Sequence, residues 1–370
     1  MRVLFTGGGT GGHVYPALAV AQLLSREDQN AKLLFVGTER GLESELVPKA
    51  GFELETISSA GLKRRLTPAN LSTLFQNLHG FVQALRIIRR FRPEVVVGTG
   101  GYVMVPVVLA AALCRIPVLL HEQNALPGLA NRSLSRFARR VAVSYEDSAR
   151  FFPKRKVLVS GNPVREAVWR RGREEGRKNL DIDPGVQLVV VFGGSRGARP
   201  LTEAAVAAAP ALLAQPGNML LVVTGSADFA TIEEKVRRAG IPAPGKGKML
   251  LRPYLYNMED ALAAADLVVT RAGATTIAEI TARGIPAILV PSPYVTANHQ
   301  EYNARLLVDR GAAIMIREKD LSGRRLAQTV QDLLARPEER ALMAERARAL
   351  GRRDAAHIIA AEIKRLAGCQ

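Results

Sequence analysis

Apolar residues in this chain gather into short, continuous runs that alternate with segments of helical periodicity. The runs are rich in valine, leucine and isoleucine, which is typical of strands buried on both faces of a parallel sheet. They lie at residues 2–6, 32–36, 94–98, 116–120, 140–144, 156–160, 187–192, 219–223, 248–251, 266–270 and 286–290. Because helical segments separate many of these runs, the pattern predicts an α/β fold with parallel sheets and crossover helices.

The same design occurs twice along the chain. A buried strand at 2–6 leads into a glycine loop and a helix, and residues 189–214 repeat this order with an alanine-rich helix. Two such starts predict two doubly wound halves, joined near 160–168, where glycine and proline punctuate the chain. Ligands of such folds bind at the carboxyl ends of the strands, so we expect the site in a cleft between two domains.

Composition supports two globular domains. A chain of 370 residues, 48% of them hydrophobic, can form two cores. Two cysteines, Cys114 and Cys369, are too few for a disulfide framework, which favours a reducing compartment. Residues 95–114 carry no charge, but glycines and Pro106 divide them. We therefore expect a buried strand and then a helix starting near Pro106, not a membrane span.

Positive charge is concentrated in one part of the sequence. The chain has 51 basic and 34 acidic residues, a net charge of +17, and residues 56–145 alone hold twelve basic and two acidic ones. Such a cluster attracts nucleic acid, anionic lipid or a phosphorylated substrate. A generally basic proteome would explain the total but not the clustering. Aromatic residues are 5% of the chain and do not interleave with the cluster, which argues against nucleic acid.

The first glycine loop, residues 7–12, formally matches the dinucleotide fingerprint GxGxxG. The acidic residue that such a site places on the ribose is missing, since Glu39 comes late. The loop also has the spacing of a P-loop, but His13 and Val14 replace the required Lys-Ser/Thr, which argues against ATP hydrolysis. What remains is a glycine-rich helix start, which suits an anion.

Two more glycine loops follow predicted strands, at 98–102 and 193–198. Each alone could be a tight strand-to-helix turn. Three loops at the same topological position favour an anionic ligand shared between the domains. A further motif, Thr276-x-x-Glu279, fits a helix capping box, or alternatively a carboxylate that accepts hydrogen bonds from two ribose hydroxyls.

Taken together, the motifs resemble those of the bacterial N-acetylglucosaminyltransferases of peptidoglycan synthesis. These enzymes move GlcNAc from UDP-GlcNAc onto undecaprenyl-diphospho-muramoyl-pentapeptide (lipid I), giving lipid II. The matching segments cover nearly the whole chain in order: GGTGGHVYPALA, GTERGLE, GLKRR, VVVGTGGYV, PVLLHEQN, GNPVR, GGSRGA, RAGATTIAE and NHQEYNA. The resemblance implies the GT-B fold, with two Rossmann-like domains facing across an interdomain cleft. It implies an acceptor and membrane-side domain at 1–164, a UDP-GlcNAc domain at 165–351, and a C-terminal helix, about 352–370, packed on the first domain.

The resemblance also implies donor-binding residues in both domains. They are Thr10, Gly11, Gly12, Asn124, Arg165, Ser195, Leu255, Ala274, Thr275, Thr276, Ile277, Ala278, Glu279 and Gln300. In the family pattern, the backbone of Leu255 reads uracil, Glu279 binds the ribose, and Gln300 binds GlcNAc hydroxyls. Arg165 and Ser195 would approach the diphosphate.

Catalytic candidates carried over in the same way are His13, Asn124 and Glu122. Gly100, Gly101 and Tyr102 match the loop for the acceptor diphosphate. Two positions depart from the pattern: Arg196 stands where glutamine is common, and Ala297 where aspartate is frequent.

The implied reaction is an inverting displacement without metal or cofactor. His13 suits the role of general base at neutral pH, or alternatively it only hydrogen-bonds the loop at the helix start. Helix N-termini and Arg165 would stabilise departing UDP. The sequence Asp181-Ile182-Asp183 precedes Pro184-Gly185, so we interpret it as a turn before a strand, not as a metal site.

A lipid-linked acceptor also implies a membrane surface. No acidic residue lies between Thr56 and Pro93. Apolar residues at helical spacing occur there at 71, 74, 75, 78, 81, 82, 85 and 88. The flanking basic residues are Lys63, Arg64, Arg65, Arg86, Arg89, Arg90 and Arg92. The stripe fits an ordinary core helix, but with a lipid substrate it favours peripheral binding of residues 62–92 to the anionic inner leaflet, at the cytoplasmic face of the plasma membrane.

Other cell-wall synthesis enzymes are expected as further partners. The closest alternative is another UDP-sugar enzyme of the same fold, a UDP-GlcNAc 2-epimerase or a glycolipid glycosyltransferase. Such an enzyme would share the uridine site without needing the loop at 98–102 or the basic face. A dehydrogenase is disfavoured by the missing ribose acid in the first half.

Overall fold

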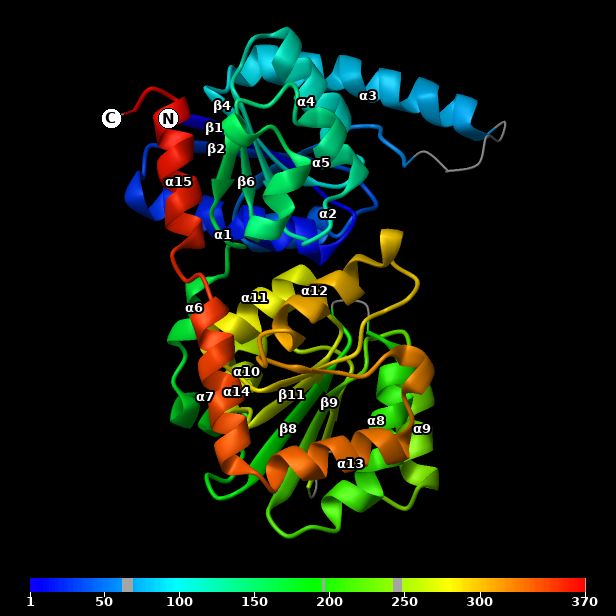
Figure 1. Cartoon of the computed structure of the whole chain (residues 1–370). Helices are drawn as coiled ribbons and strands as arrows, with labels where there is room; N and C mark the ends of the chain where they lie inside the picture. The colour runs from blue at the N-terminus through cyan, green and yellow to red at the C-terminus, as the bar shows by residue number, and fades with distance from the viewer. Residues whose placement is uncertain (62–68, 195–196, 242–247, 370) are drawn as a thin grey trace. The chain divides into compact units, whose positions relative to one another are not determined.

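The computed structural model describes residues 1–61, 69–194, 197–241 and 248–369 (Figure 1). The chain divides into two compact units. Unit 1 comprises Met1–Arg165 and Arg352–Gln370, and unit 2 comprises Glu166–Gly351. The first segment of unit 1 therefore ends at Arg165, one residue later than the boundary after residue 164 that the resemblance implied.

Unit 1 is built on a parallel sheet of seven strands in the order β3-β2-β1-β4-β5-β6-β7. The strands are β1 (Arg2–Gly7), β2 (Lys32–Gly37), β3 (Glu53–Thr56), β4 (Val95–Gly100), β5 (Val118–Glu122), β6 (Arg140–Val143) and β7 (Val157–Val159). The chain order reverses between β1 and β4, which is where doubly wound sheets bind ligands.

Helices cover both faces of this sheet. They are α1 (Gly11–Glu27), α2 (Glu43–Lys49), α3 (Ala69–Phe91), α4 (Met104–Leu113), α5 (Leu129–Leu134) and α15 (Ala355–Leu366). One core lies between the sheet and helices α3 and α4, and another between the sheet and helices α1 and α15. Two short 3₁₀ helices, η1 (Glu146–Phe151) and η2 (Lys154–Lys156), precede β7.

Unit 2 repeats the plan with six parallel strands in the order β10-β9-β8-β11-β12-β13. The strands are β8 (Gln187–Phe192), β9 (Asn218–Val223), β10 (Met249–Arg252), β11 (Leu267–Thr270), β12 (Ala287–Leu289) and β13 (Ile314–Met315). The helices are α6 (Glu166–Arg170), α7 (Arg173–Asn179), α8 (Arg199–Leu213), α9 (Phe229–Arg238), α10 (Met258–Ala264), α11 (Ala274–Arg283), α12 (His299–Val308), α13 (Gly323–Leu334) and α14 (Pro337–Leu350), with 3₁₀ turns η3 (Thr296–Asn298) and η4 (Glu318–Asp320). The chain order reverses between β8 and β11.

The predicted α/β class with two parallel sheets is confirmed. The uncharged stretch 95–114 forms β4 and α4, as expected, although α4 begins at Met104 rather than at Pro106. Within the described ranges, every helix is too short or too polar to cross a bilayer.

Candidate active site

The first two glycine loops of unit 1 lie against each other at the point where the strand order reverses. The backbone N–H of Gly8 donates to the carbonyl of Gly100 (3.2 Å), and the hydroxyl of Thr99 donates to the carbonyl of His13 (2.8 Å). Loops that are far apart in sequence thus form one surface after β1 and β4, as the position of the loops predicts.

Glycine is required where these loops touch. Gly100 and Gly101 have φ values of +120° and +84°. A Cβ on Gly100 would lie 2.5 Å from the ring of His13, and one on Gly101 would lie 2.5 Å from the carbonyl oxygen of Gly8. Side chains at these positions would push the loops apart. The predicted acceptor loop therefore packs directly on the candidate base, with partly exposed Tyr102 beside it.

His13 is half-buried in the first turn of α1. Its Nδ1 atom lies 2.9 Å from the carbonyl oxygen of Gly8, and 3.4 Å from the hydroxyl of Thr10. A carbonyl oxygen only accepts hydrogen bonds, so we assign the proton of the neutral ring to Nδ1. Nε2 then carries the lone pair that a general base needs. The hydrogen bond to the loop and the role as base are compatible, because they use different nitrogens.

Glu122, at the end of β5, is buried beneath Asn124. One carboxylate oxygen accepts hydrogen bonds from the backbone N–H and side-chain amide of Asn124, at 3.0 and 3.2 Å. The other accepts from the backbone of Gly128 (3.0 Å) and the amide of Asn131 (2.8 Å). With both oxygens engaged, Glu122 is suited to positioning Asn124 rather than to touching substrate, which argues against the catalytic role that the resemblance implied.

Two neighbouring polar residues, His121 and Gln123, were not identified as site residues from the sequence. The side-chain amide of Gln123 donates to the carbonyl of Thr99 (2.6 Å) and to Nδ1 of His121 (3.0 Å). Nε2 of His121 lies 3.1 Å from the carbonyl oxygen of Gly161. Burial lowers the pKa of His121 to about 4, so the ring is neutral and bridges the strand ends. Polar residues closing the otherwise apolar strand at 118–122 were the available signal.

In unit 2 the carboxyl ends of three strands meet in register. Thr270 of β11 pairs with Phe192 of β8 on one side and with Leu289 of β12 on the other. The loops that follow β8 and β11 therefore start side by side. The predicted residues Ala274 to Glu279 form the first turns of α11, directly after β11. Ser195 and Arg196, in the loop after β8, lie outside the described residues.

The capping-box interpretation of Thr276 and Glu279 is wrong. The N-cap of α11 is Gly273, so Thr276 already lies inside the helix. Glu279 is half-buried in the second turn, too far along the helix to complete a box. The hydroxyl of Thr275 is buried and finds no hydrogen-bond partner among the described residues. A buried hydroxyl beside a helix N-terminus is suited to an anionic ligand.

Three other expected donor-site residues occupy defined positions. The side-chain oxygen of Gln300 accepts from the backbone N–H of Ser292 (2.9 Å), which fixes the side chain against the loop after β12. Leu255 is half-buried between β10 and α10. The guanidinium of Arg165, in unit 1, lies over the ring of Tyr15 at 5.4 Å. Ala297, one of the departures, has a left-handed φ of +53°.

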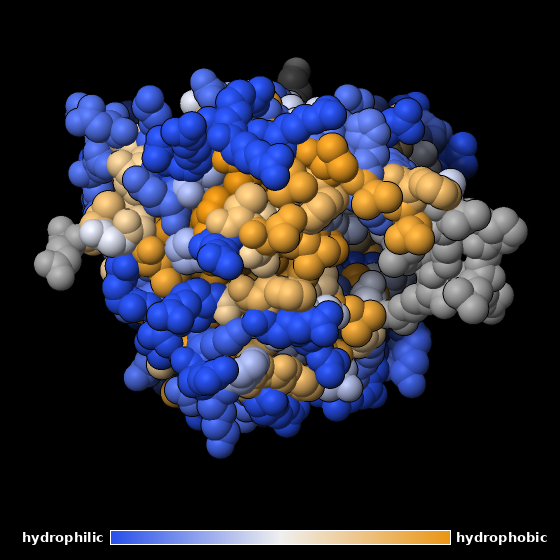
Figure 2. All heavy atoms as spheres, turned by 90° about the horizontal axis from the view of Figure 1, so that it is seen from above, coloured by the Kyte–Doolittle hydropathy of each residue, from blue (hydrophilic) through white to orange (hydrophobic). Residues whose placement is uncertain are grey.

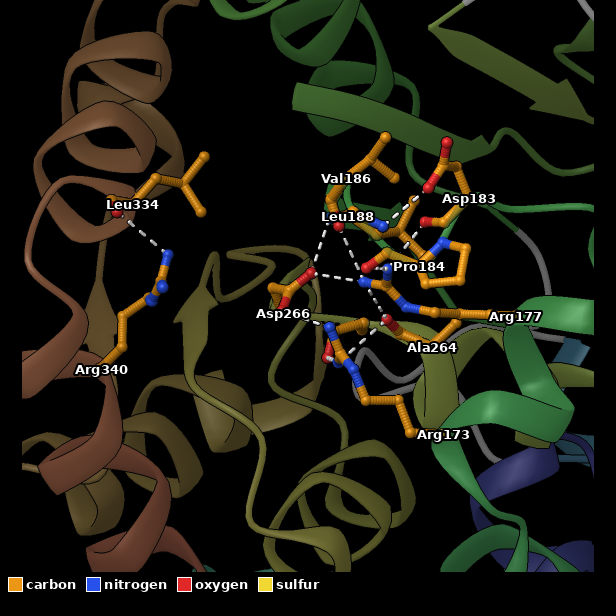
Figure 3. Close-up of polar contacts among 12 residues, drawn as sticks. Arg173, Arg177, Asp183, Pro184, Val186, Leu188, Ala264, Asp266, Leu334 and Arg340 are labelled. Atoms are coloured by element: carbon orange, nitrogen blue, oxygen red, sulfur yellow. Dashed lines mark hydrogen bonds and ion pairs between the residues drawn. The ribbon is translucent and has the colours of Figure 1, made fainter. Parts of the chain in front are cut away.

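The sequence Asp181-Ile182-Asp183 forms a turn before β8, as predicted. The carboxylate of Asp183 accepts from the backbone N–H of Gly185 (2.7 Å). Figure 3 shows the guanidinium of Arg177 pointing at the carbonyls of Asp183, Pro184 and Val186. Arg177 also pairs with Asp266 at 2.9 Å. Among the described residues, no group of His, Cys, Asp and Glu side chains is arranged to hold a metal ion.

Comparison with known protein families identifies the class of protein to which this chain belongs. Residues 3–143 match the family model of the glycosyltransferase family 28 N-terminal domain, and residues 188–359 match that of the C-terminal domain. Two Rossmann-like units with ligand loops at their reversal points are the halves of a GT-B glycosyltransferase, so the expected fold is confirmed. The chain belongs to glycosyltransferase family 28.

Curated relatives match over nearly their full length. A protein of Caldanaerobacter subterraneus subsp. tengcongensis is 48% identical over 97% of this chain and 98% of its own. One of Desulforudis audaxviator is 47% identical over 100% and 99%. Both are named UDP-N-acetylglucosamine--N-acetylmuramyl-(pentapeptide) pyrophosphoryl-undecaprenol N-acetylglucosamine transferase.

Solved structures of glycosyltransferases match the fold of this chain over nearly its full length. The crystal structure of Acinetobacter baumannii MurG is 29% identical, with a TM-score of 0.76, and the match covers 98% of this chain and 99% of that one. Anabaena Alr3699/HepE in complex with UDP has a TM-score of 0.64 at 15% identity, with 100% of both chains covered. The second likeness concerns the fold alone.

Proposed function

We propose that this chain transfers GlcNAc from UDP-GlcNAc to the muramoyl 4-hydroxyl of undecaprenyl-diphospho-MurNAc-pentapeptide, lipid I, giving lipid II. The observation that carries the proposal is identity of 44–48%, over almost the entire chain, to relatives named for this transfer. That similarity favours the transferase over a UDP-GlcNAc 2-epimerase or a glycolipid glycosyltransferase.

His13 is the proposed general base. The acceptor hydroxyl oxygen attacks the anomeric carbon of GlcNAc, and its proton passes to Nε2 of His13. The bond between the anomeric carbon and the β-phosphate oxygen breaks on the opposite face, and UDP departs with the bonding electron pair. One displacement inverts the anomeric configuration. The assignment is supported by the Nδ1 contact to Gly8, which leaves Nε2 as the basic nitrogen.

UDP-GlcNAc binding is assigned mainly to unit 2. The start of α11, with the buried hydroxyl of Thr275, is suited to phosphate oxygens, because backbone N–H groups and the helix dipole favour negative charge there. Glu279 would accept hydrogen bonds from the ribose diol, Leu255 would contact uracil, and Gln300 would contact GlcNAc. Arg165, held on Tyr15, would add positive charge near the diphosphate.

The membrane-binding surface is assigned to α3. The predicted stripe of apolar positions on α3 divides in two: Ile88 packs into the core, whereas Leu74, Phe75 and Leu78 are 59%, 65% and 58% exposed. Figure 2 shows apolar atoms gathered across one face, bordered by hydrophilic residues. An exposed run of large apolar side chains on one helix is typical of a binding surface, and a lipid-linked acceptor makes the bilayer the fitting partner.

Basic residues on the same helix support this assignment. Arg86 and Arg89 are exposed near its C-terminal end, Arg92 is exposed directly after it, and Arg90 pairs with Glu55. Each exposed arginine close to an anionic leaflet contributes about 1 kcal/mol of attraction. Lys63, Arg64 and Arg65 lie outside the described residues. We assign the enzyme to the cytoplasmic face of the plasma membrane as a peripheral protein, where other cell-wall synthesis enzymes would be neighbours.

Acceptor-dependent release of UDP tests the function against its alternative. The purified chain is incubated with UDP-GlcNAc, with and without a short-chain lipid I analogue, and free UDP is followed by a coupled assay. A transferase releases UDP only when the acceptor is present. Formation of UDP-N-acetylmannosamine in the absence of acceptor would identify an epimerase and refute the proposal.

A further inference from the structure

The first glycine loop is built over a buried carboxylate that the proposed chemistry does not use. Glu43, the first residue of α2, is 1% exposed. One oxygen accepts hydrogen bonds from the backbone N–H and hydroxyl of Thr38, at 3.0 and 2.8 Å. The other oxygen accepts from the backbone N–H of Gly9 at 2.9 Å.

Glycines make the space for this carboxylate. A Cβ on Gly8 or on Gly41 would overlap its oxygens, and a Cβ on Gly37 would overlap its side-chain carbons. The loop after β1, the end of β2 and the segment between β2 and α2 thus each have a glycine where Glu43 lies against them. Burying a carboxylate is costly unless hydrogen bonds satisfy it, so an arrangement this closely fitted indicates a function for the charge.

The carboxylate connects to the candidate base through a single peptide group. The N–H of Gly9 and the carbonyl of Gly8 belong to the same peptide unit. Its N–H donates to Glu43, and its carbonyl accepts from Nδ1 of His13, each at 2.9 Å. The order of groups is carboxylate, peptide, imidazole.

We propose that Glu43 is a positioning residue that acts on His13 through the Gly8–Gly9 peptide. The proposal rests on the proposed function of His13 as base. Hydrogen bonds in a chain polarise one another, so the carboxylate strengthens the carbonyl as an acceptor for the Nδ1 proton. This holds the proton on Nδ1, keeps Nε2 basic, and stabilises the imidazolium formed when the acceptor hydroxyl loses its proton, as the aspartate of a catalytic triad does directly.

The arrangement also changes the interpretation of the loop. The sequence suggests a cradle of amides for phosphate, but the N–H of Gly9 is directed to Glu43. A buried carboxylate under the loop repels phosphate and favours a neutral acceptor hydroxyl above it. The start of α11 is the more suitable binding place for the diphosphate of UDP-GlcNAc.

We call the connection from Glu43 through the Gly8–Gly9 peptide to His13 the relay. Glu43→Gln tests it, with Glu45→Gln on the same helix as the matched control. Glutamine has one oxygen, but donors approach from Gly9 and Thr38 on both sides, so one N–H must face the new amide group. We expect turnover to fall about 10- to 100-fold with UDP affinity unchanged. Glu45 is exposed and paired with Lys49, so its variant should keep full turnover. Turnover of Glu43→Gln within twofold of wild type would overturn the relay.

A double-mutant cycle separates this role from a structural one. If Glu43 acts through His13, then Glu43→Gln costs little further in a chain that already carries His13→Ala. Equal losses in both backgrounds would mean that Glu43 only supports the fold, and would refute the proposal.

The tautomer of His13 gives a readout that depends on neither folding of a variant nor activity. In ¹⁵N-histidine-labelled wild-type chain, long-range ¹H–¹⁵N spectra should show neutral His13 protonated at Nδ1. Protonation at Nε2 would overturn the relay whatever the kinetics. Conversely, a wild-type chain with the Nδ1 tautomer but no transfer to lipid I would refute the proposed function while leaving the connection from Glu43 to His13 intact.

Discussion

At the scale of single residues, the candidate site separates into groups proposed to contact ligand and groups that hold them. Asn124 is oriented by buried Glu122, and His13 by the peptide of Gly8 and Gly9. The sequence pointed to His13 through the glycine loop beside it and the family resemblance, and to Asn124 through the resemblance alone. They could not reveal the role of Glu43, since a carboxylate in a loop segment is ordinarily solvated and only the three-dimensional packing buries it.

Glu279 provides a test of the donor site. The N-cap of α11 is Gly273, so the capping box does not explain this carboxylate, and its proposed role is to accept hydrogen bonds from the ribose hydroxyls. Glu279→Gln should raise the KM for UDP-GlcNAc about tenfold, the loss of roughly one charge-assisted hydrogen bond, with little change in thermal stability. Steady-state kinetics at saturating acceptor measure this, with exposed Glu338→Gln on α14 as control. An unchanged donor KM would remove Glu279 from the site.

His121 predicts a pH dependence of stability. Its folded pKa is about 4 because of burial, against 6.5 for the exposed side chain. The unfolded chain therefore binds a proton that the folded chain does not, and the free energy of unfolding falls as pH drops from about 6.5 to about 4. The contribution lost is about 3 kcal/mol. Urea unfolding across this range should show a shallower pH dependence for His121→Gln than for wild type. Parallel curves would contradict a neutral buried ring.

At the scale of elements, continuous apolar runs predicted the central strands well, because strands buried on both faces leave little freedom of sequence. The runs did not include β3 and β13. The sequence of β3, Glu-Leu-Glu-Thr, is half polar at the sheet edge, and β13 has only two residues. Their pairing depends on neighbouring strands that the local pattern does not contain. The division of the α3 stripe between core and surface likewise depends on what packs against each turn.

Helix α3 carries the prediction for membrane binding. Replacing Leu74, Phe75 and Leu78 with serine removes exposed apolar surface, so fold and soluble-acceptor kinetics should be preserved. Co-sedimentation with vesicles containing anionic lipid should fall at least tenfold, because each buried side chain of this kind is worth about 1.5–3 kcal/mol. Binding by wild type should weaken with salt. Equal binding by the triple variant and wild type would move the membrane surface elsewhere.

The turn before β8 carries a prediction for stability. Arg177 is 3% exposed and holds three carbonyls of the turn as well as Asp266 (Figure 3). Arg177→Met should lower the free energy of unfolding of unit 2 by about 3 kcal/mol, because the carbonyls of the turn lose a buried charged donor, whereas Asp266 keeps its hydrogen bonds from Arg173 and from the backbone N–H of Leu188. Arg340 donates to the single carbonyl of Leu334 (3.1 Å), so Arg340→Met should cost about 1 kcal/mol. Equal effects on urea unfolding would contradict the account of the turn.

At the scale of the whole molecule, two parallel sheets place the ligand loops after β1 and β4 in unit 1 and after β8 and β11 in unit 2. The repeated strand, glycine loop and helix predicted this plan. The charge of the chain, +17, fits a molecule that meets UDP, a lipid diphosphate and an anionic surface. These features are consistent with the proposed anionic, membrane-linked substrate, and the similarity to named relatives is what favours lipid I in particular.

The most direct measurement is the mass of the acceptor after incubation. The chain is mixed with UDP-GlcNAc and a short-chain lipid I analogue in the presence of EDTA, and the lipid product is analysed by mass spectrometry and β-N-acetylhexosaminidase digestion. We predict the addition of one N-acetylhexosamine that β-hexosaminidase removes, in undiminished yield with EDTA, because the proposed displacement uses no metal ion to stabilise the departing UDP. An unchanged acceptor in a chain that binds UDP-GlcNAc would contradict the account.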